Sequence, residues 1–374
     1  MSKVAFVLNQ PTPYRNPVFR LMVKRNKFTY RFMYCTQVEP NRSWTVSNEG
    51  LDLLFLRQNI LSQLSDYIHA NLGVWQELSR FKPAVVVTGG YNPTHLLAVL
   101  YCIIRRVRHV SSTDGDMEYE RGMSPLHKVV RRLVRLCTSA YVGPSDSSLE
   151  LFQTWGASSA QVFKSPLCAD NEALAVSAKA SKIYDFVFCG QLVERKGPLF
   201  ALEVASGVAQ ILGRRVKILF LGDGTQQQLI EDLAESLDGV EVTMAGFIQP
   251  EETPNWFGQS RILLFPCKRD AWGLVVNEAF AAGVAVISSP FPGASRELVE
   301  NGVSGLILPL EMDVWVKEAA ALLADERRSM EMGRRGQAIV EKYSYLHAAA
   351  GLEDAIAHAV GDACQSLAPG PPRL

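Results

Sequence analysis

The sequence lacks the features that mark disulfide-bonded, zinc-binding or membrane-spanning proteins. Its seven cysteines are scattered over 374 residues, with no CxxC pair and no compact cluster, which is typical of reduced thiols in a cytosolic protein. The longest apolar run, residues 96–104, is far shorter than the roughly 20 residues that span a bilayer. The six histidines have no metal-ligand spacing, and residues 1–10 lack the apolar core of a signal peptide. A cytoplasmic protein without a metal is expected.

The formal net charge of the chain is also zero, but its two halves carry opposite net charges. Residues 1–180 hold 21 Lys and Arg against 13 Asp and Glu, whereas residues 181–374 hold 17 against 25. The basic half has a helical pattern at 126–137, with Arg131, Arg132 and Arg135 beside regularly spaced apolar residues. Such a helix can lie on the inner face of an anionic membrane, or it can be an ordinary core-facing helix with a solvated basic side. The sequence leaves both interpretations open.

The chain alternates strand patterns with helix patterns, which predicts an α/β fold with parallel sheets. Strands are predicted at 4–8, 29–34, 85–88, 108–111 and 140–143, and then at 184–189, 216–221, 240–245, 262–265 and 284–288. We therefore expect two Rossmann-like doubly wound domains, 1–170 and 183–344, that face each other across a ligand cleft. Residues 171–182 are the predicted linker, 345–364 a C-terminal helix that packs back on the first domain, and 365–374 a disordered tail.

The most informative segment is 267–288, CKRDAWGLVVNEAFAAGVAVIS. Asp270 and Glu278 stand eight positions apart around Gly273, between one predicted strand and the next. A loop at the carboxyl end of a parallel strand that leads into a helix presents free backbone N–H groups to an anion. Carboxylates beside such a loop are suited to hydroxyl groups. The segment therefore predicts a ligand that is part phosphate and part sugar.

Other loops of the second half carry similar signals. A predicted strand ends at Gly190 and is followed by Arg195 and Lys196, and the next strand ends in the turn from Gly222 to Gly224. Paired cations beside a glycine turn suit a diphosphate, since Arg binds it bidentately and Lys acts as a point charge. Each signal alone is weak, because a solvated Arg-Lys pair is common. Their recurrence at successive strand ends favours a ligand site.

These motifs, in order, are GQLVERKG, LFLGDG, AGF, DAWGLVVNEAFAAGVAVISS and GASRELVENGVSGLILP. The series resembles the donor-binding domain of family 4 glycosyltransferases of GT-B fold, the glycosyl transferases group 1. The resemblance covers about 183–345 closely. The first half is similar only in layout and in NQPTPYRNPVF.

The resemblance implies a role for each matching residue. Asp270 would lie near the hydroxyls of the donor sugar, Glu278 on the ribose, and Lys196 on the diphosphate. Asp270 stands where the family usually has Glu, so its reach is one methylene shorter. Gln191 stands where an arginine is usual, and Arg195 is the residue expected to supply that charge.

The remaining donor-site positions implied by the resemblance are turns and backbone groups. They are the glycines Gly190, Gly222 and Gly224, the amides of Gly273, Leu274 and Val275 along phosphate and sugar, and Phe247 and Ile248 beside the base. Lys196, Arg195 and the loop amides would neutralise the departing nucleoside diphosphate without a metal. The resemblance implies transfer with retention of configuration, with a nucleotide-diphosphate sugar as substrate and no other cofactor.

The first domain offers weaker candidates. The loop 111–116 holds Asp114, which could bind donor or acceptor hydroxyls, where family members often carry a histidine. Its DGD sequence is similar to the metal-binding DxD of the GT-A fold, but a GT-A protein would not contain the second-half motifs. Arg15 lies in the first strand–helix loop and could face the cleft, or it could simply begin a helix.

Three functions remain at this point. The first is transfer of a sugar from a nucleotide donor to a glycan or lipid-linked acceptor, in polysaccharide or glycoconjugate biosynthesis, with contact to an anionic membrane and none to nucleic acid. The second is a nucleotide-sugar epimerase or a sugar phosphorylase on the same fold. The third is a non-catalytic binding partner, favoured by Gln191, Asp270 and the absent histidine.

Overall fold

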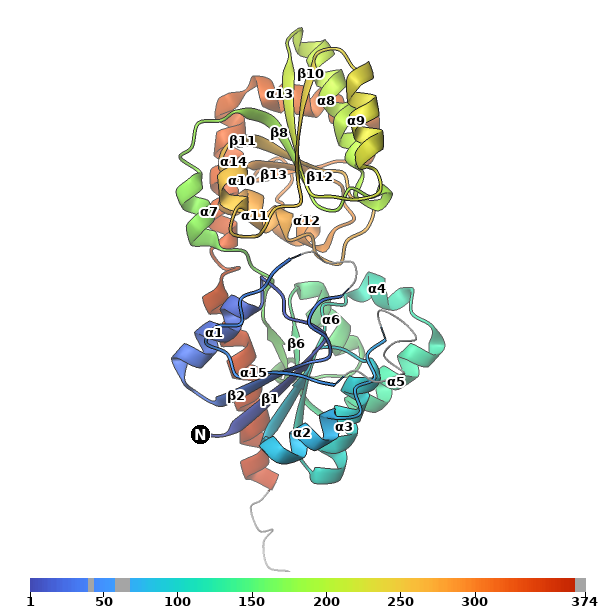
Figure 1. Cartoon of the computed structure of the whole chain (residues 1–374), viewed down its shortest axis with the longest axis vertical. Helices are drawn as coiled ribbons and strands as arrows, with labels where there is room; N and C mark the ends of the chain where they lie inside the picture. The colour runs from blue at the N-terminus through green and yellow to red at the C-terminus, as the bar shows by residue number, and fades with distance from the viewer. Residues whose placement is uncertain (40–43, 58–67, 367–374) are drawn as a thin grey trace, which may run out of the picture. The chain divides into compact units, whose positions relative to one another are not determined.

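The computed structural model of the chain describes residues 1–39, 44–57 and 68–366. The chain divides into two compact units (Figure 1). The first unit comprises Met1–Leu167 together with Tyr345–Leu374, and the second is Cys168–Ser344. Each unit is built around one parallel sheet, as the alternating pattern predicts.

The sheet of the first unit has the strand order β3-β2-β1-β4-β5-β6-β7, and all neighbours are parallel. Its strands are β1 (Lys3–Leu8), β2 (Thr29–Tyr34), β3 (Leu53–Phe55), β4 (Val85–Thr88), β5 (Arg108–Ser112), β6 (Thr138–Gly143) and β7 (Val162–Lys164). The central residues of β1, β4 and β6 are apolar and buried, because helices cover both faces of a parallel sheet. The order reverses direction between β1 and β4, which makes the ends of these two strands the switch point of the sheet.

The helices of this unit connect successive strands, and one returns from the end of the chain. They are α1 (Asn16–Arg25), α2 (Val74–Phe81), α3 (Pro93–Arg105), α4 (Met117–Arg121), α5 (Pro125–Arg135), α6 (Asp146–Thr154), the 3-10 turn η2 (Ser159–Gln161) and α15 (Tyr345–Ser366). Helix α15 packs against α1 and β6 (Figure 1). Its buried Glu353 accepts ion pairs from Arg25 at 3.0 Å and Lys27 at 2.9 Å, so three charges hold the returning helix in place.

The second unit repeats this plan with the order β10-β9-β8-β11-β12-β13. Its strands are β8 (Tyr184–Cys189), β9 (Val216–Leu221), β10 (Val240–Gly246), β11 (Ser260–Phe265), β12 (Ala285–Ser288) and β13 (Gly305–Ile307). Its helices are α7 (Asn171–Ser177), α8 (Pro198–Leu212), α9 (Gln227–Ser236), α10 (Thr253–Gly258), α11 (Val275–Ala281), α12 (Gly293–Leu298), α13 (Met312–Ala324) and α14 (Glu326–Val340), with the 3-10 turn η3 (Glu194–Lys196). The core joins Phe186, Phe220 and Trp315, and the switch point lies between β8 and β11.

The predicted α/β architecture with two parallel sheets is confirmed. The sequence missed β3, β7 and β13, which have three residues each and are too short to give a strand pattern. Residues 171–182, predicted as a linker, begin with α7, which packs against α10 and α11. The predicted C-terminal helix continues to Ser366, two residues past its predicted end at 364. The rest of the predicted tail, from 367 onward, lies outside the described residues. Within the described ranges, no helix is both long and apolar enough to cross a membrane.

Helix α5 fits neither of the two interpretations of its sequence completely. Arg131 is buried, whereas Leu126, Val129 and Leu133 are exposed. A core-facing helix would bury its leucines and leave its arginines in water. The structure shows the reverse for Arg131 and the three exposed apolar residues, whereas Arg132 is exposed and Val134 is buried, as a core-facing helix would have them.

Candidate functional site

The predicted donor residues gather at the switch point of the second unit. Strand β8 lies beside β11 in the sheet, and each is followed by one of the charged loops, 190–197 and 266–274. The amide of Lys268 donates to the carbonyl of Arg195 at 2.7 Å, which ties the two loops together. Open parallel sheets bind ligands at this point, where neighbouring loops diverge.

The loop after β8 holds the two predicted cations. Lys196 ends the turn η3, and Gly197 follows in the left-handed region with φ 73°, which favours glycine. Arg195 donates to the side-chain oxygen of Gln191 at 2.9 Å and to the carbonyl of Arg269 at 3.2 Å. Gln191 is therefore in contact with Arg195, the residue expected to supply the charge of the arginine that is missing at position 191.

Lys196 and Asp270 form an ion pair across these two loops. Only 12% of the Lys196 side chain and 22% of the Asp270 side chain are exposed. The ammonium also lies 5.5 Å from the centre of the Phe265 ring. The second carboxylate oxygen of Asp270 accepts from the amide of Trp272 at 3.4 Å. A half-buried cation that is held by one carboxylate can bind a phosphate group, while the carboxylate can accept from sugar hydroxyls.

Glu278 lies on α11, one turn after Gly273 begins the approach to that helix. Gly273 has φ 94°, and a Cβ there would lie 2.8 Å from the Phe265 ring, so the turn has room only for glycine. Leu274 and Val275 follow it at the start of α11. Burial raises the pKa of Glu278 to about 7, because a low-dielectric surrounding disfavours the carboxylate.

The glycine turns after β8 and β9 lie against each other. Gly222 and Gly224 have φ 134° and 155°, and a side chain on either would collide with the backbone of Gly190 or Leu192. The amide of Leu192 donates to the carbonyl of Asp223 at 2.7 Å. These glycines therefore allow a close approach of two loops at the site.

The loop after β10 carries the two residues predicted to flank a base. Gly246 ends the strand with φ 70°, and Phe247 and Ile248 come next. Phe247 is 39% exposed, which is a large fraction for a phenylalanine, and Ile248 is half-buried. An exposed aromatic ring can stack on a planar ligand.

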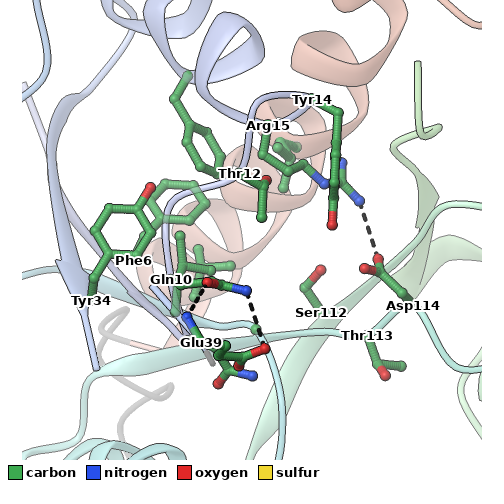
Figure 2. A pocket seen from close by; sticks show the side chains of 16 residues that line it. Phe6, Gln10, Thr12, Tyr14, Arg15, Tyr34, Glu39, Ser112, Thr113 and Asp114 are labelled. Atoms are coloured by element: carbon green, nitrogen blue, oxygen red, sulfur yellow. Dashed lines mark hydrogen bonds and ion pairs between the residues drawn. The ribbon is translucent and has the colours of Figure 1, made fainter. Parts of the chain in front are cut away.

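The first unit has a cavity of about 210 Å³ at its own switch point (Figure 2). The lining comes from β1 and the loop after it, from the ends of β2 and β4, from residues 112–114 at the end of β5, and from one residue each of α1 and α15. Arg15 and Asp114, the two candidates predicted for this unit, both line it and form an ion pair at 3.3 Å. Arg15 also donates to the hydroxyl of Ser165 at 3.1 Å.

Several polar residues that line the same cavity were not predicted as site residues, among them Gln10, Tyr14 and Glu39. Glu39 donates its amide to the side chain of Gln10 at 2.8 Å and accepts from it at 3.1 Å. His69 lies 3.4 Å from the other carboxylate oxygen of Glu39. Gln10 and Tyr14 belong to the NQPTPYRNPVF motif, so that motif was a usable signal, whereas Glu39 is brought in only by the fold.

The described residues contain no group of three or more His, Cys, Asp or Glu side chains that could hold a metal ion. The carboxylates Asp270 and Asp114 are instead paired with the cations Lys196 and Arg15.

Comparison with known proteins finds a family match for the part of the chain that carries the motif series. Residues 170–339 match the family described as Glycosyl transferases group 1. A D-inositol 3-phosphate glycosyltransferase from Nocardia farcinica is 30% identical over 176 residues, 44% of this chain and 38% of that protein. The sulfoquinovosyl transferase SQD2 from Arabidopsis thaliana is 26% identical over 41% of this chain and 30% of its own length. The matched stretch thus spans well under half of these relatives.

Solved structures match the whole chain. HepE from Anabaena, solved in complex with UDP and glucose, superposes with a TM-score of 0.72 at 14% identity and covers 96% of this chain and all of its own. Sucrose-phosphate synthase from Thermosynechococcus elongatus gives a TM-score of 0.71 at 15% identity, with 97% and 100% coverage. Two parallel α/β units of this kind define the GT-B fold, which is the fold of this chain.

Proposed function

We propose that the chain is a glycosyltransferase that moves a sugar from a nucleotide-diphosphate donor to a hydroxyl acceptor. The observation that carries the proposal is the ion pair between Lys196 and Asp270, at the switch point of the unit that matches the group 1 glycosyl transferases. Glu278, on the adjoining helix, is a further charged residue of the proposed donor site.

The donor would bind along the loops that follow β8, β9, β10 and β11. Lys196 and Arg195 would neutralise the diphosphate, Asp270 would accept from the sugar hydroxyls, and Glu278 would accept from the ribose. The glycine turns at Gly190, Gly222 and Gly224, together with the amides of residues 273–275, would let the phosphates approach the backbone. Phe247 and Ile248 would flank the base. HepE was solved with UDP and glucose, so UDP-sugars are the first donors to test.

The reaction would break the bond between the anomeric carbon and the diphosphate oxygen and form a bond from that carbon to an acceptor oxygen. The electron pair of the broken bond would pass to the diphosphate, where Lys196 and Arg195 stabilise the developing charge. In the retaining course that the family resemblance suggests, the acceptor attacks on the leaving-group side, and a phosphate oxygen takes the hydroxyl proton. The arrangement then needs neither a hydrolytic carboxylate pair nor a metal.

The acceptor would bind in the cavity of the first unit. Arg15, Asp114, Gln10 and Glu39 present donors and acceptors there at close range, which suits a polyhydroxylated molecule. The proposal takes this acceptor to be a glycan or a lipid-linked glycan in polysaccharide or glycoconjugate biosynthesis. It places the protein in the cytoplasm, consistent with six described cysteines that are all free.

A second candidate is nucleotide binding without transfer. Gln191 replaces a cation and is bonded to Arg195, so part of the charge available to stabilise the transition state is engaged elsewhere. Turnover separates the two candidates: a catalytic protein releases nucleoside diphosphate only when donor and acceptor are both present, whereas a binding protein retains the donor intact.

The experiment is a ligand screen by saturation-transfer NMR and thermal shift against nucleoside diphosphates and nucleotide sugars. It is run on the wild type, on Glu278→Ala and on a control, Glu241→Ala, whose carboxylate lies on β10 paired with Lys217. We expect one base and one sugar to bind to wild type and control, and binding to be lost in Glu278→Ala. Equal binding by all three proteins would refute the donor site, and no binding to any would refute the proposed function.

A further inference from the structure

Helix α5 presents a stripe of large apolar side chains to solvent. Leu126 is 71% exposed, Val129 50%, Leu133 61% and Leu136 78%. Because an α-helix turns by about 100° per residue, spacings of three and four residues place these four side chains on one side. A contiguous exposed apolar stripe costs free energy in water, and it marks an interaction surface more often than a solvated one.

The opposite side of α5 is fixed to the rest of the unit. Arg131 is buried and forms an ion pair with Glu120. Its guanidinium lies 4.9 Å from the centre of the Tyr91 ring and 5.7 Å from that of Trp155, and Val134 is buried beside it. A rotation of the helix that hid its leucines would expose these contacts and unpair a buried charge. These contacts therefore keep the apolar stripe turned toward the solvent.

Helix α3 repeats the pattern. Leu100 is 44% exposed, Ile103 54% and Ile104 59%, while its other side buries Ala98, Tyr101 and Cys102. Helix α3 leads from β4 to β5, and α5 lies in the next connection, from β5 to β6. Right-handed crossovers in the same direction along a sheet lie on the same face, and the contact of Tyr91, just before α3, with Arg131 of α5 joins them. Figure 1 shows both helices on the same side of the first unit.

Basic residues border this apolar surface, and acidic ones are missing from it. Neither α3 nor α5 contains Asp or Glu. Arg105 and Arg106 are exposed at the end of α3, and Arg132 is exposed on α5 beside the stripe. We define the α3–α5 face as these three arginines together with the seven exposed apolar residues named above.

We propose that the α3–α5 face docks on an anionic lipid surface, with its apolar side chains in the headgroup–acyl boundary and its arginines on the lipid phosphates. An amphipathic helix with large apolar residues on one side and arginines at the margin is the arrangement that lies in such an interface. This proposal deepens the expected membrane contact by assigning its residues, and it depends neither on the donor site nor on sugar transfer.

Charge complementarity selects this occupant over others. A nucleic acid would satisfy the arginines but leave seven apolar side chains in water, and an uncharged lipid surface would leave the arginines without counter-ions. A second copy of the chain would bring arginine against arginine if it met the same face. An anionic bilayer surface satisfies both kinds of side chain at once.

The test is co-sedimentation of the full chain with vesicles of phosphatidylcholine alone and of equal parts phosphatidylcholine and phosphatidylglycerol. Two double variants are compared with the wild type, Val129→Ser/Leu133→Ser and Arg105→Gln/Arg132→Gln. Their controls are Ile211→Ser/Leu229→Ser and Arg327→Gln/Lys342→Gln, which change exposed residues of the second unit. Circular dichroism and nucleotide binding on the same samples report folding and the donor site separately.

We expect binding to the anionic vesicles only. Loss of two arginines should weaken it about 25-fold, at about fivefold per charge near an anionic surface, and loss of the two apolar side chains about tenfold or more. Both controls should bind as the wild type does. Added salt should weaken the binding of the wild type more than that of Arg105→Gln/Arg132→Gln.

Three results would overturn the proposal. One is a wild type that stays in solution with both kinds of vesicle. Another is vesicle binding that falls equally in the controls and the variants. The third is a dimer, detected by light scattering, that the serine substitutions dissociate in a protein without vesicle affinity, because the face would then be a self-association surface.

Discussion

The two units share a strand order but differ in the chemistry of their loops. Around the first strand of each sheet the order is the same, β2-β1-β4 in the first unit and β9-β8-β11 in the second. Both therefore have a switch point with loops at the carboxyl ends of the strands. In the second unit these loops carry Lys196 and Asp270, with Glu278 close by, whereas in the first they carry Arg15 and Asp114. The fold determines where a ligand can bind, and the loops determine which ligand it is.

The helices differ in the same way. Exposed large apolar residues of the second unit, such as Ile211 and Leu229, lie on different helices, which is normal for a protein surface. In the first unit such residues gather on the outer sides of α3 and α5. The donor site proposed for the second unit needs no such apolar surface. For the first unit, by contrast, the inferred partner is an anionic lipid surface.

The largest expected effect follows from removing the cation of the second unit. In Lys196→Ala the dissociation constant for the nucleoside diphosphate should rise about 30-fold or more, since a charge-assisted contact in a largely buried site contributes about 2–5 kcal/mol. Isothermal titration calorimetry measures it. Lys217→Ala, which also removes a lysine from an ion pair, is the matched control and should bind normally. A shift of less than threefold in Lys196→Ala would remove this residue from the site.

A change in the first unit should separate acceptor from donor. Arg15→Ala removes both the ion pair to Asp114 and the hydrogen bond to Ser165. We expect nucleotide affinity to stay unchanged and acceptor-dependent transfer to fall about tenfold to 100-fold, because hydrogen bonds to charged groups contribute about 1.5–3 kcal/mol. The measurement is the rate of diphosphate release with and without acceptor. Weaker nucleotide binding in this variant would contradict the division of roles between the units.

The raised pKa of Glu278 predicts a pH dependence. Only the carboxylate accepts from both ribose hydroxyls, so nucleotide affinity should rise several-fold, up to about tenfold, as the pH passes upward through about 7. The nucleotide titrates as well, so the quantity to measure is the difference between the wild type and Glu278→Gln at each pH. A constant difference between pH 6 and pH 8 would show that Glu278 does not contact the nucleotide.

The same pKa predicts the sign of a stability change. Burial favours the protonated form, so the contribution of Glu278 to stability is full below its ordinary pKa of 4.5 and is lost as the pH rises through about 7. Glu278→Gln should therefore melt at a higher temperature than the wild type at pH 8 and at nearly the same temperature at pH 4.5. A variant that melts lower at pH 8 would contradict this assignment.

The smallest effect concerns Gln191, which stands where the resemblance implies an arginine. Gln191→Arg should tighten diphosphate binding about threefold, because a new partly exposed charge contributes less than about 1 kcal/mol. Gln191→Lys, with a point charge in place of a planar fork, should gain less. If Gln191→Arg instead weakens diphosphate binding, repulsion between the new arginine and Arg195 outweighs the attraction to the diphosphate. Arg195 would then already supply the charge of the missing arginine.

Most of the fold could be predicted from the sequence because strands buried on both faces leave continuous apolar runs, as in β8 and β11. The loops of the proposed donor site could be located for the same reason, since they follow those runs directly. The first-unit cavity could not be predicted in full, because Glu39 reaches it through its hydrogen bonds with Gln10, 29 positions away.

The orientation of helix α5 could not be predicted from the sequence either. The spacing in α5 correctly indicates an amphipathic helix, but the inward side depends on Glu120, Tyr91 and Trp155, which surround Arg131. These partners come from three separate segments, so the sequence of the helix alone cannot show that its arginine is buried and its leucines are not.

The central claim is that the second unit carries the donor site. The most direct test is hydrogen–deuterium exchange of the full chain with and without the nucleoside diphosphate that binds in the ligand screen. The account predicts slower amide exchange in the loops 190–197, 222–225, 246–248 and 268–278. It also predicts unchanged exchange in 9–15 and 112–114 of the first unit. Protection confined to the first-unit loops would contradict it.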